Sequence, residues 1–451
     1  MAAEIWVVIE YIIKIGAMGV VPENRRPASS SAWLLLILFL PLVGLPMYLL
    51  LGSARIQGKR YRRQNELTSI VSTLSANLPD VPPGIKADER LLGIVRMNRH
   101  LTGMPCMPGT VQGIYDDTRS FIAALVQAID AAHHSVNIEF YIVHDDPITE
   151  PLFAALERAH KRGVRVALLL DHLGSRRYKA WKKLLKRLNS AGYHWHLMMP
   201  LGFKPDQRGR PDLRNHRKVL VVDGRVAFSG SQNAIHRSYD PPENIKKGLE
   251  WKDLTFSCTG PIVEELNAIF VSDWYSETNQ LILAEINTNI PYYKDGMRAQ
   301  VVPSGPGFET ENNLRLINYL IYNAERRITI CSPYFVPEET LLQALTNAAY
   351  SGIETTVIVC EKGDQFLPNM AQRSYYEQLL QAGVRILQYP SPTVLHSKFM
   401  MVDDEITFIG SSNMDPRSFS LNMEVSTFVI DRGMVAMLDE VCAEYEQVCT
   451  E

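Results

Sequence analysis

The sequence contains few cysteines, and none of them are arranged as in a metal site or a disulfide framework. Six cysteines lie among 451 residues, at positions 106, 258, 331, 360, 442 and 449, and no two have CxxC spacing. This scatter excludes a zinc module and a disulfide-stapled secreted domain, and it favours reduced thiols in the cytoplasm. His194 and His196 lie two residues apart, but no carboxylate or cysteine accompanies them at ligand spacing, so no metal site is predicted.

The chain as a whole also lacks a large excess of either positive or negative charge. There are 46 Lys and Arg against 49 Asp and Glu, which gives a formal net charge of -3. Residues 1–63 hold eight basic and three acidic side chains and so carry +5, whereas residues 64–451 hold 38 and 46 and carry -8. Nucleic-acid binding depends largely on neutralising phosphates with basic side chains. The acidic larger part therefore argues against a nucleic-acid partner.

Charge is absent altogether from residues 27–54, and residues 32–51 (AWLLLILFLPLVGLPMYLLL) are almost all apolar. A helix of this length spans about 30 Å, the thickness of a bilayer core. We expect a transmembrane helix here, although a buried core helix has the same composition. Basic residues flank the run and are more frequent after it, so the positive-inside rule places the larger part of the chain in the cytoplasm; they are Arg25, Arg26, Arg55, Lys59, Arg60, Arg62 and Arg63.

A second hydrophobic segment covers residues 5–21 and carries Glu10 and Lys14, four residues apart on one helical face. It is either a second span or a helix lying in the membrane interface. Residues 1–63 are thus predicted to form a membrane anchor with two hydrophobic helices, at about 5–21 and 32–51.

After a connector rich in Pro and Gly (64–115), the rest of the chain reads as two similar halves, 116–290 and 291–451. Each half alternates helical runs with apolar strands, for example VNIEFYIV and RVALLLD in the first and ITICSPYFV and TTVIVC in the second. This alternation predicts right-handed βαβ units around a mostly parallel sheet. The fold class is therefore α/β, with two α/β domains packed as an internal pseudo-dimer.

The clearest repeat lies near the end of each half. The first half has HRKVLVVDGRVAFSGSQN and the second has HSKFMMVDDEITFIGSSN. Six polar or small residues recur 180 positions apart, and chance does not explain so many matches at one offset. The pairs are His216 and His396, Lys218 and Lys398, Asp223 and Asp403, Gly230 and Gly410, Ser231 and Ser411, and Asn233 and Asn413.

These residue types suit an anionic phosphate. His and Lys two residues apart on a strand share a face, and the Asp that follows sits where a hairpin should turn and deliver the GSxN segment beside them. Lys and Asn can hold phosphate oxygens, while His can attack phosphorus or exchange a proton. Because each half supplies only one set, we expect the halves to meet so that two histidines flank one phosphorus atom.

The motif HxKx4D followed by GSxN, present twice, resembles the phospholipase D superfamily. The two hydrophobic N-terminal segments, with EFYIVHDD, RGVRVALLLDHLGS, SPYFVPEE and NMDPRSFSLNMEV, make nearly the whole chain similar to the bacterial cardiolipin synthases of that superfamily. The resemblance implies a multi-pass enzyme of the bacterial inner membrane that joins two phosphatidylglycerol molecules into cardiolipin and glycerol. It also implies phosphatidylglycerol and other anionic phospholipids as partners, and no nucleotide, metal or other cofactor.

Within this resemblance, His216 is expected to be the nucleophile and His396 the general acid and base, although the near symmetry of the halves allows the roles to be exchanged. Lys218 and Lys398 are expected to be catalytic, because their charges can stabilise the phosphoryl oxygens. The expected phosphate- or substrate-binding residues are Asn233, Asn413, Ser231 and Ser411. Two carboxylates in matching places after the GSxN segments, Glu424 and Asp253, are expected to orient the histidines. Asp223 and Asp403 are either catalytic or hairpin-capping turn residues.

Other residues carry separate hypotheses. The basic run from Arg176 (RRYKAWKKLLKRL) fits a helix leaning on anionic lipid or a sheet-covering helix with a solvated basic face. Glu139, Tyr141 and Tyr334 lie at strand ends where ligands collect in α/β sheets. His144 and His236 could lie near the site. Three rival functions remain: a hydrolytic phospholipase D, a phosphodiesterase acting on nucleic acid, and a lipid-binding scaffold without catalysis.

Overall fold

The computed structural model describes residues 2–23, 27–52, 58–82, 89–202, 210–239, 242–282, 296–308 and 310–451. The chain forms two units, Met1–Ile56 and Gln57–Glu451. The expected domain boundary at residue 290 lies outside the described residues, as do Arg25, Arg26 and Arg55. The smaller unit thus ends a few residues before the predicted anchor boundary at residue 63.

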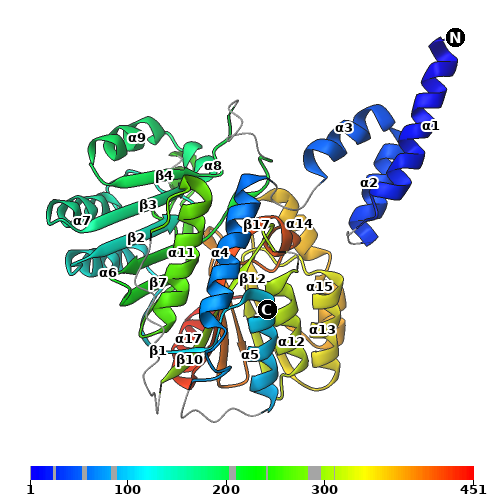
Figure 1. The fold of residues 1–451 in the computed structure, drawn as a ribbon. Coiled ribbons are helices and arrows are strands. Elements are labelled where there is room, and N and C mark those ends of the chain that lie inside the picture. The colour runs from blue at the N-terminus through cyan, green and yellow to red at the C-terminus, as the bar shows by residue number, and fades with distance from the viewer. Residues whose placement is uncertain are drawn as a thin grey trace. The chain divides into compact units, whose positions relative to one another are not determined.

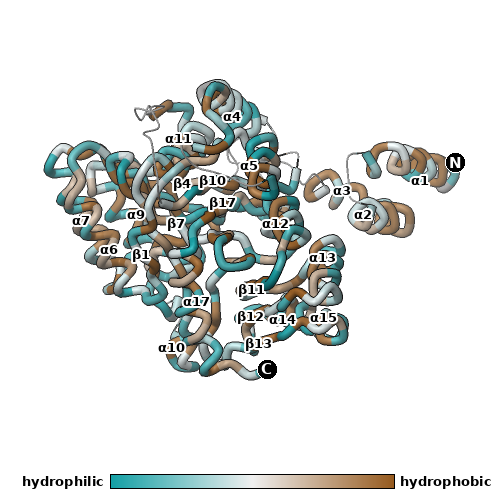
Figure 2. Tube along the Cα trace, turned by 90° about the horizontal axis from the view of Figure 1, so that it is seen from below, coloured by the Kyte–Doolittle hydropathy of each residue, from teal (hydrophilic) through white to brown (hydrophobic). Residues whose placement is uncertain are grey.

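The smaller unit consists of three helices, α1 (Ala2–Val20), α2 (Pro27–Phe39) and α3 (Pro41–Leu51), along which hydrophobic residues predominate (Figure 2). The single helix expected over residues 32–51 is instead divided at Leu40, because proline at 41 cannot continue the hydrogen-bond ladder of α2. The chain folds back there, and the rings of Trp33 and Tyr48 meet with centroids 5.7 Å apart. Among the residues described, none of the helices combines the length and the apolar character needed to cross a bilayer.

Among its described residues, the first half of the larger unit, taken from β1 onward, holds six helices and seven strands that follow one another across the main sheet. The strands are β1 (Met107–Tyr115), β2 (Ser135–Phe140), β3 (Arg165–Asp171), β4 (His194–Met198), β6 (Lys218–Val222), β7 (Val226–Gly230) and β9 (Thr255–Thr259). The helices are α6 (Thr118–Asp130), α7 (Glu150–Lys161), α8 (His172–Arg176), α9 (Trp181–Ser190), α10 (Pro242–Lys246) and α11 (Ile262–Thr278).

The second half repeats this order. Its strands in the main sheet are β10 (Met297–Ser304), β11 (Arg327–Cys331), β12 (Glu354–Cys360), β13 (Arg385–Tyr389), β15 (Phe399–Val402), β16 (Ile406–Gly410) and β17 (Asn422–Ile430). Its helices are α12 (Asn312–Tyr322), α13 (Glu339–Tyr350), α14 (Phe366–Arg373), α15 (Tyr376–Ala382), α16 (Pro416–Ser420) and α17 (Arg432–Glu446).

The two halves share one continuous sheet, with strand order β13-β12-β11-β15-β16-β17-β10-β1-β9-β7-β6-β2-β3-β4. The antiparallel pair β1 and β10 joins them at the centre (Figure 1). In each half only the three outermost strands are parallel, and the four inner strands are antiparallel. The expected mostly parallel sheet is therefore a mixed one, because the His-containing hairpin and its neighbours insert antiparallel strands.

Sequence patterns explain the outer elements. The strand β3 reads RVALLLD and is buried over six of its seven residues, as expected for a parallel strand covered on both faces. Helix α6 begins at an N-cap, Asp117, whose side chain accepts hydrogen bonds from two backbone amides, and its buried residues pack onto the core of the first half. Helix α9, the predicted basic helix, buries Leu184 and Leu188 in the same core. It thus covers the sheet, and the structure does not test its lipid hypothesis.

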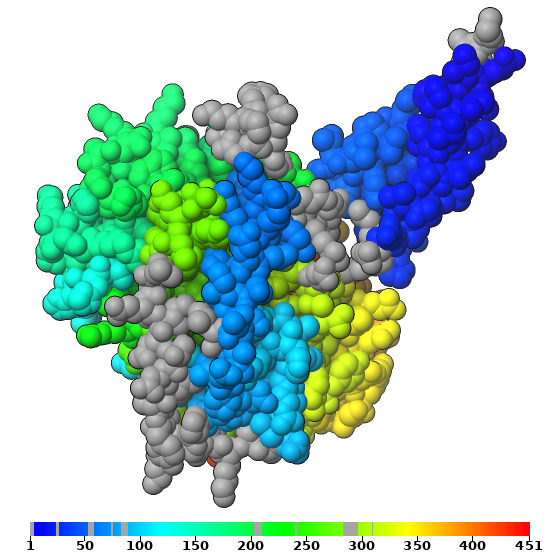
Figure 3. All heavy atoms as spheres, viewed as in Figure 1, coloured from blue at the N-terminus to red at the C-terminus, as the bar shows by residue number. Residues whose placement is uncertain are grey.

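Residues 64–115, expected to be a connector, are instead largely structured. They include most of α4 (Lys59–Ser75), all of α5 (Glu89–Thr102) and strand β1. Helix α4 packs beside α11, where Arg60 forms a bidentate ion pair with Glu277, and α5 packs against α12 (Figure 3). This segment therefore packs against both halves and forms part of the larger unit.

Candidate active site

His216 follows a short strand that joins the second half of the molecule. This strand, β5 (Arg214–Asn215), runs parallel to the start of β17, and the backbone amide of His216 donates to the carbonyl of Met423 at 2.8 Å. The next residue of β17 is Glu424, whose two carboxylate oxygens lie 3.1 and 3.0 Å from Nδ1 of His216. The first histidine is thus oriented by a carboxylate of the other half.

His396 is held in the same way with the halves exchanged. It follows β14 (Thr393–Leu395), which pairs with β8 (Glu250–Lys252) of the first half, and its amide donates to the carbonyl of Lys252 at 2.7 Å. Its Nδ1 lies 2.6 Å from Oδ1 of Asp253. In both rings Nδ1 is occupied by a carboxylate, which leaves Nε2 as the nitrogen that can act on a substrate.

The two histidines line one cavity of about 940 Å³ between the halves of the larger unit. Asn233 and Asn413 also line it, as do Tyr141 and Tyr334, which the sequence placed at strand ends. The ring of Tyr141 lies edge-on to His216, with centroids 4.9 Å apart. One cavity is therefore lined by both imidazoles.

The duplicated serines lie behind the histidines. Ser231 Oγ donates to Oδ1 of Asp253 at 2.7 Å, and Ser411 Oγ donates to Glu424 at 2.5 Å. These contacts differ from the expected substrate contact, because each hydroxyl is hydrogen-bonded to the carboxylate that orients a histidine. The serines thus fix the carboxylates in place.

The duplicated asparagines line the cavity, whereas the duplicated lysines are buried and are not among its lining residues. The ammonium groups of Lys218 and Lys398 donate to the carbonyl oxygens of His216 and His396, respectively. Asn233 accepts from the amide of Ile142 and donates to the hydroxyl of Tyr239, so its amide group is already hydrogen-bonded within the protein. Asn413 Oδ1 is buried and has no hydrogen-bond partner among the described residues.

Burial controls the charges of these groups. It lowers the pKa of His216 to about 4, and Lys218 adds to this lowering while Glu424 opposes it. Burial also lowers the pKa of His396, again assisted by a neighbouring lysine. The pKa of Lys218 falls to about 7 and that of Lys398 to about 8, mainly because the ammonium groups are buried. An arriving phosphate anion would restore their positive charge.

The structure places Asp223 and Asp403 away from the histidines, at the turns of the hairpins. Asp223 lies at the opposite end of β6 from Lys218, has a positive φ of 53°, and accepts hydrogen bonds from the backbone amides of residues 133–135. Asp403 has a φ of 54° and accepts from the amides of residues 325–327 and from Arg90. This geometry agrees with the turn interpretation and not with direct contact to substrate.

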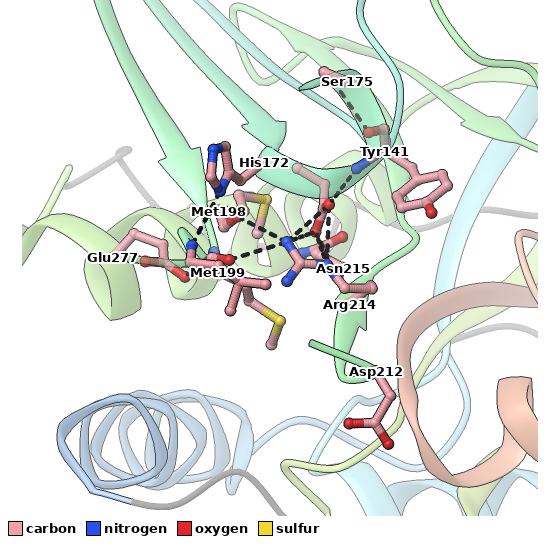
Figure 4. Close-up of polar contacts among 12 residues, drawn as sticks. Tyr141, His172, Ser175, Met198, Met199, Asp212, Arg214, Asn215 and Glu277 are labelled. Carbon is pink, nitrogen blue, oxygen red and sulfur yellow. Dashed lines mark hydrogen bonds and ion pairs between the residues drawn. The ribbon is translucent and has the colours of Figure 1, made fainter. Parts of the chain in front are cut away.

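A buried ion pair fixes the strand that leads to His216. Arg214 donates to Asp171 at 2.9 Å and to the carbonyl of Met199 at 3.0 Å, and the amide of Met199 donates to Glu277 (Figure 4). Asp171 also accepts from the amide of Asn215. His194 and His196, for which no metal site was predicted, lie on the edge strand β4 and do not line the cavity.

Other candidates from the sequence fall outside the cavity. Glu139 is fully buried, and burial raises its pKa with the help of the nearby Asp273. His144 contacts Asp146 through Nδ1 at 3.2 Å, and His236 contacts Ser238 at 2.8 Å; neither histidine lines the cavity. Arg177 and Arg417 line the cavity but were not predicted as site residues. Arg177 was considered only as part of the basic run from Arg176, and nothing in the repeat distinguishes Arg417 from a surface arginine.

The chain matches known protein families over most of its length. A family described as "Cardiolipin synthase, PLD-like domain" matches residues 125–274 and 317–448, and a family described as "Phospholipase_D-nuclease N-terminal" matches residues 5–53. A cardiolipin synthase of Halalkalibacterium halodurans is 33% identical over 426 residues, which cover 92% of this chain and 82% of that protein. One from Clostridium perfringens is 31% identical and covers 95% and 90%, respectively.

A solved structure shares the fold. The phosphatidylserine synthase of Haemophilus influenzae Rd KW20 superimposes with a TM-score of 0.57, covering 81% of this chain and 92% of that one. Its sequence identity is 15%, so the likeness concerns the fold alone.

Proposed function

Because this chain belongs to the cardiolipin synthase family with phospholipase D-like domains, we propose that it joins two phosphatidylglycerol molecules to form cardiolipin and release glycerol. One observation carries the proposal. Two histidines from the two halves, each oriented through Nδ1 by a carboxylate of the opposite half, line one cavity. A site of this kind needs a phosphodiester that both rings can reach.

In the first step, Nε2 of His216 attacks the phosphorus of the donor lipid. The bond from phosphorus to the glycerol oxygen breaks, and His396 gives its proton to that oxygen, so that glycerol leaves and phosphatidyl-histidine remains. The strong lowering of the pKa of His216, caused first by burial, keeps its imidazole neutral and suits it to be the nucleophile. Burial lowers the pKa of His396 as well, but the carboxylate of Asp253, 2.6 Å from Nδ1, opposes this lowering and stabilises the proton that the ring must carry in this step.

In the second step, His396 removes a proton from a headgroup hydroxyl of the acceptor phosphatidylglycerol. The resulting oxygen attacks phosphorus and the bond to His216 breaks, which gives cardiolipin and restores both rings. We propose that Lys218 and Lys398, whose ammonium groups donate to the carbonyl oxygens of His216 and His396, stabilise the negative charge that develops on the phosphoryl oxygens. Asn413, which lines the cavity, contributes to the same stabilisation. Asp253 and Glu424 act as positioning residues in both steps.

The acceptor lipid brings a second phosphate, and we propose that two arginines lining the cavity bind it. Arg177 comes from the first half and Arg417 from the second. Arg417 is exposed and donates to the carbonyl of Asp212. The equivalent residue in the first half, Arg237, is instead ion-paired with Glu250 and does not line the cavity. This asymmetry supports a donor side and an acceptor side in a site that is otherwise duplicated.

We also propose that the N-terminal unit is a multi-pass anchor in the bacterial inner membrane and that the catalytic unit is cytoplasmic. Apolar side chains on its helices are highly exposed, such as Phe39 at 78% and Leu49 at 73%. Basic residues in the sequence are more frequent after the hydrophobic run than before it, which favours this orientation. Protease digestion of spheroplasts and of inverted membrane vesicles checks this: only the inverted vesicles should lose the catalytic unit.

The activity is tested with the purified full-length protein in phosphatidylglycerol vesicles, following cardiolipin, glycerol and phosphatidic acid together. We expect cardiolipin and glycerol to rise in equal amounts and to be lost in His216→Ala and in His396→Ala. Phosphatidic acid without cardiolipin would mean that water is the acceptor and that the protein is a hydrolase. Acid quenching followed by mass spectrometry of the peptide containing His216 tests the covalent intermediate.

A further inference from the structure

Helix α14 faces its apolar side chains outward and its polar side chain inward. Phe366, Leu367 and Met370 are 76%, 77% and 52% exposed. The one buried residue of α14 is Gln372, whose side chain accepts from the amide of Phe335 and donates to the hydroxyl of Tyr376. A surface helix normally buries its apolar face, so this inverted arrangement indicates that something other than water covers α14.

This helix lies at the mouth of the active-site cavity. Leu367 lines the cavity together with Pro368 and Ala371, and Phe366 and Met370 belong to the adjoining exposed surface. The opposite half contributes α10 to the same mouth, where Asn244 and Lys247 line the cavity; both helices are labelled in Figure 2. Between those two residues Ile245 is 57% exposed. Exposed apolar side chains from both halves therefore border one opening.

Basic side chains accompany these apolar residues. Lys246 ends α10, Lys247 follows it, and Arg373 ends α14, and all three are exposed. Apolar side chains flanked by lysine and arginine are typical of surfaces that enter the interface of an anionic bilayer. The chemistry thus fits a membrane that contains acidic phospholipid.

We propose that α10, Lys247 and α14 form a docking rim that inserts into the surface of an anionic phospholipid bilayer and seats the cavity mouth on it. The inference rests on the proposed function, because a lipid substrate must bring its headgroup to the histidines while its acyl chains remain in an apolar medium. A rim inserted beside the mouth lets the headgroup rise without exposing the chains to water. A protein partner bound to the same surface would obstruct the mouth at which a lipid headgroup must enter the cavity. We therefore assign the rim to lipid.

The test uses an environment-sensitive fluorophore, NBD, on the full-length protein in vesicles of phosphatidylglycerol and phosphatidylcholine. Five of the six native cysteines are buried, so Cys449→Ser provides a background for labelling Phe366→Cys. The matched control is Tyr350→Cys, at the end of α13, where the native side chain is 70% exposed. We expect nitroxide groups on the acyl chains to quench NBD at position 366 and not at position 350.

Equal, water-like emission at both positions would overturn the proposal. Protection of position 366 from aqueous iodide without quenching by lipid nitroxides would also overturn it, because protein would then cover α14. The readout does not need turnover. Quenching in a protein that makes no cardiolipin would therefore refute the proposed function and leave the docking rim intact.

A kinetic experiment tests the same rim independently. The double variant Phe366→Ser with Met370→Ser should raise the KM for bilayer phosphatidylglycerol about tenfold, since apolar area no longer enters the membrane. With monomeric dihexanoyl phosphatidylglycerol the loss of kcat/KM should be much smaller. Tyr350→Ser, which removes an equally exposed aromatic ring elsewhere, should change neither. Equal losses on both substrates in the double variant would contradict a role in docking.

Discussion

Oδ1 of Asp253 lies 2.6 Å from Nδ1 of His396, although the two residues belong to opposite halves of the chain. The same crossing joins Glu424 to His216 at 3.0 Å. Each half therefore supplies one histidine, and the carboxylate that contacts Nδ1 of that histidine comes from the other half. The duplicated motif is not two sites side by side, because neither copy contains a complete histidine and carboxylate pair.

The crossing predicts that each carboxylate acts through its own histidine. Asp253→Asn and Glu424→Gln should each lower kcat about 10²- to 10⁴-fold with little change in KM, because an amide cannot fix the tautomer of the ring or stabilise its charged form. The measurement is the initial rate of cardiolipin formation. Combining Asp253→Asn with His396→Ala should add almost nothing to the single histidine variant, and additive losses would contradict the pairing.

It also predicts that damaged copies cannot rescue one another. Full-length His216→Ala and His396→Ala proteins, reconstituted into the same vesicles, should remain inactive after mixing, since one cavity needs both rings from one chain. Wild-type protein diluted with an equal amount of either variant serves as the control and should retain its rate. Recovery of cardiolipin synthesis in the mixture would show that sites form between chains.

Much of this site could be predicted from the repeat itself. The 180-residue offset identified both histidines and both lysines, and the hairpin between Lys218 and the GSxN segment follows from the Asp-Gly turn that separates two apolar runs. The crossing of the carboxylates could not be predicted. It depends on the pairing of β5 with β17 and of β8 with β14, and strands of two or three residues leave no recognisable pattern.

Two differences in the fold have similar causes. Helix α4 begins with KRYRRQNE, whose polarity indicates a linker, yet Leu67 is buried and Arg60 is held by Glu277 of α11. The hydrophobic run predicted as one helix is long enough for a bilayer, but its division at Leu40 depends on where a proline interrupts it. Composition alone predicts neither feature. Helix α4 is held in place by tertiary contacts, and the hydrophobic run is divided by a break in the backbone at Leu40.

Asp223 provides a prediction in which stability and activity separate. Burial raises its pKa, but hydrogen bonds from three backbone amides lower it more, so the net pKa is lowered. Asp223→Ala leaves those amides without their acceptor and should cost about 2 to 4 kcal/mol of unfolding free energy, with kcat of the folded protein within about twofold of wild type. Urea denaturation and the specific activity check this.

The pH dependence of the same residue has a definite sign. Because the folded-state pKa of Asp223 is lowered, its contribution to stability is present above the unfolded pKa of about 3.9 and is lost as the pH falls through the folded value. The difference in stability between wild type and Asp223→Ala should therefore shrink in acid. A large loss of kcat at unchanged stability would instead support a catalytic role.

Arg417 should distinguish the acceptor lipid from water. Arg417→Ala removes a cation from the acceptor side and should raise the KM for phosphatidylglycerol about tenfold, while more of the covalent intermediate is lost to hydrolysis. The ratio of phosphatidic acid to cardiolipin should rise. Arg237→Ala is the matched control, because it occupies the equivalent repeat position but pairs with Glu250. An unchanged product ratio in Arg417→Ala would exclude this residue from acceptor binding.

The lowered pKa values of Lys218 and Lys398 predict how anion binding depends on pH. Burial brings them to about 7 and about 8, so both ammonium groups lose their protons as the pH rises through that range in the free protein. Inorganic sulfate, whose charge does not change there, should inhibit competitively, with an inhibition constant that rises about tenfold or more between about pH 6.5 and about pH 9. His216 does not add to this change, because its pKa of about 4 keeps it neutral throughout.

Lys218→Met should weaken sulfate binding at the lower pH and make the remaining pH dependence shallower, since only Lys398 then titrates. A flat profile in the wild-type protein would mean that the lysines keep their charge in the free site, and that burial does not govern the electrostatics of the cavity.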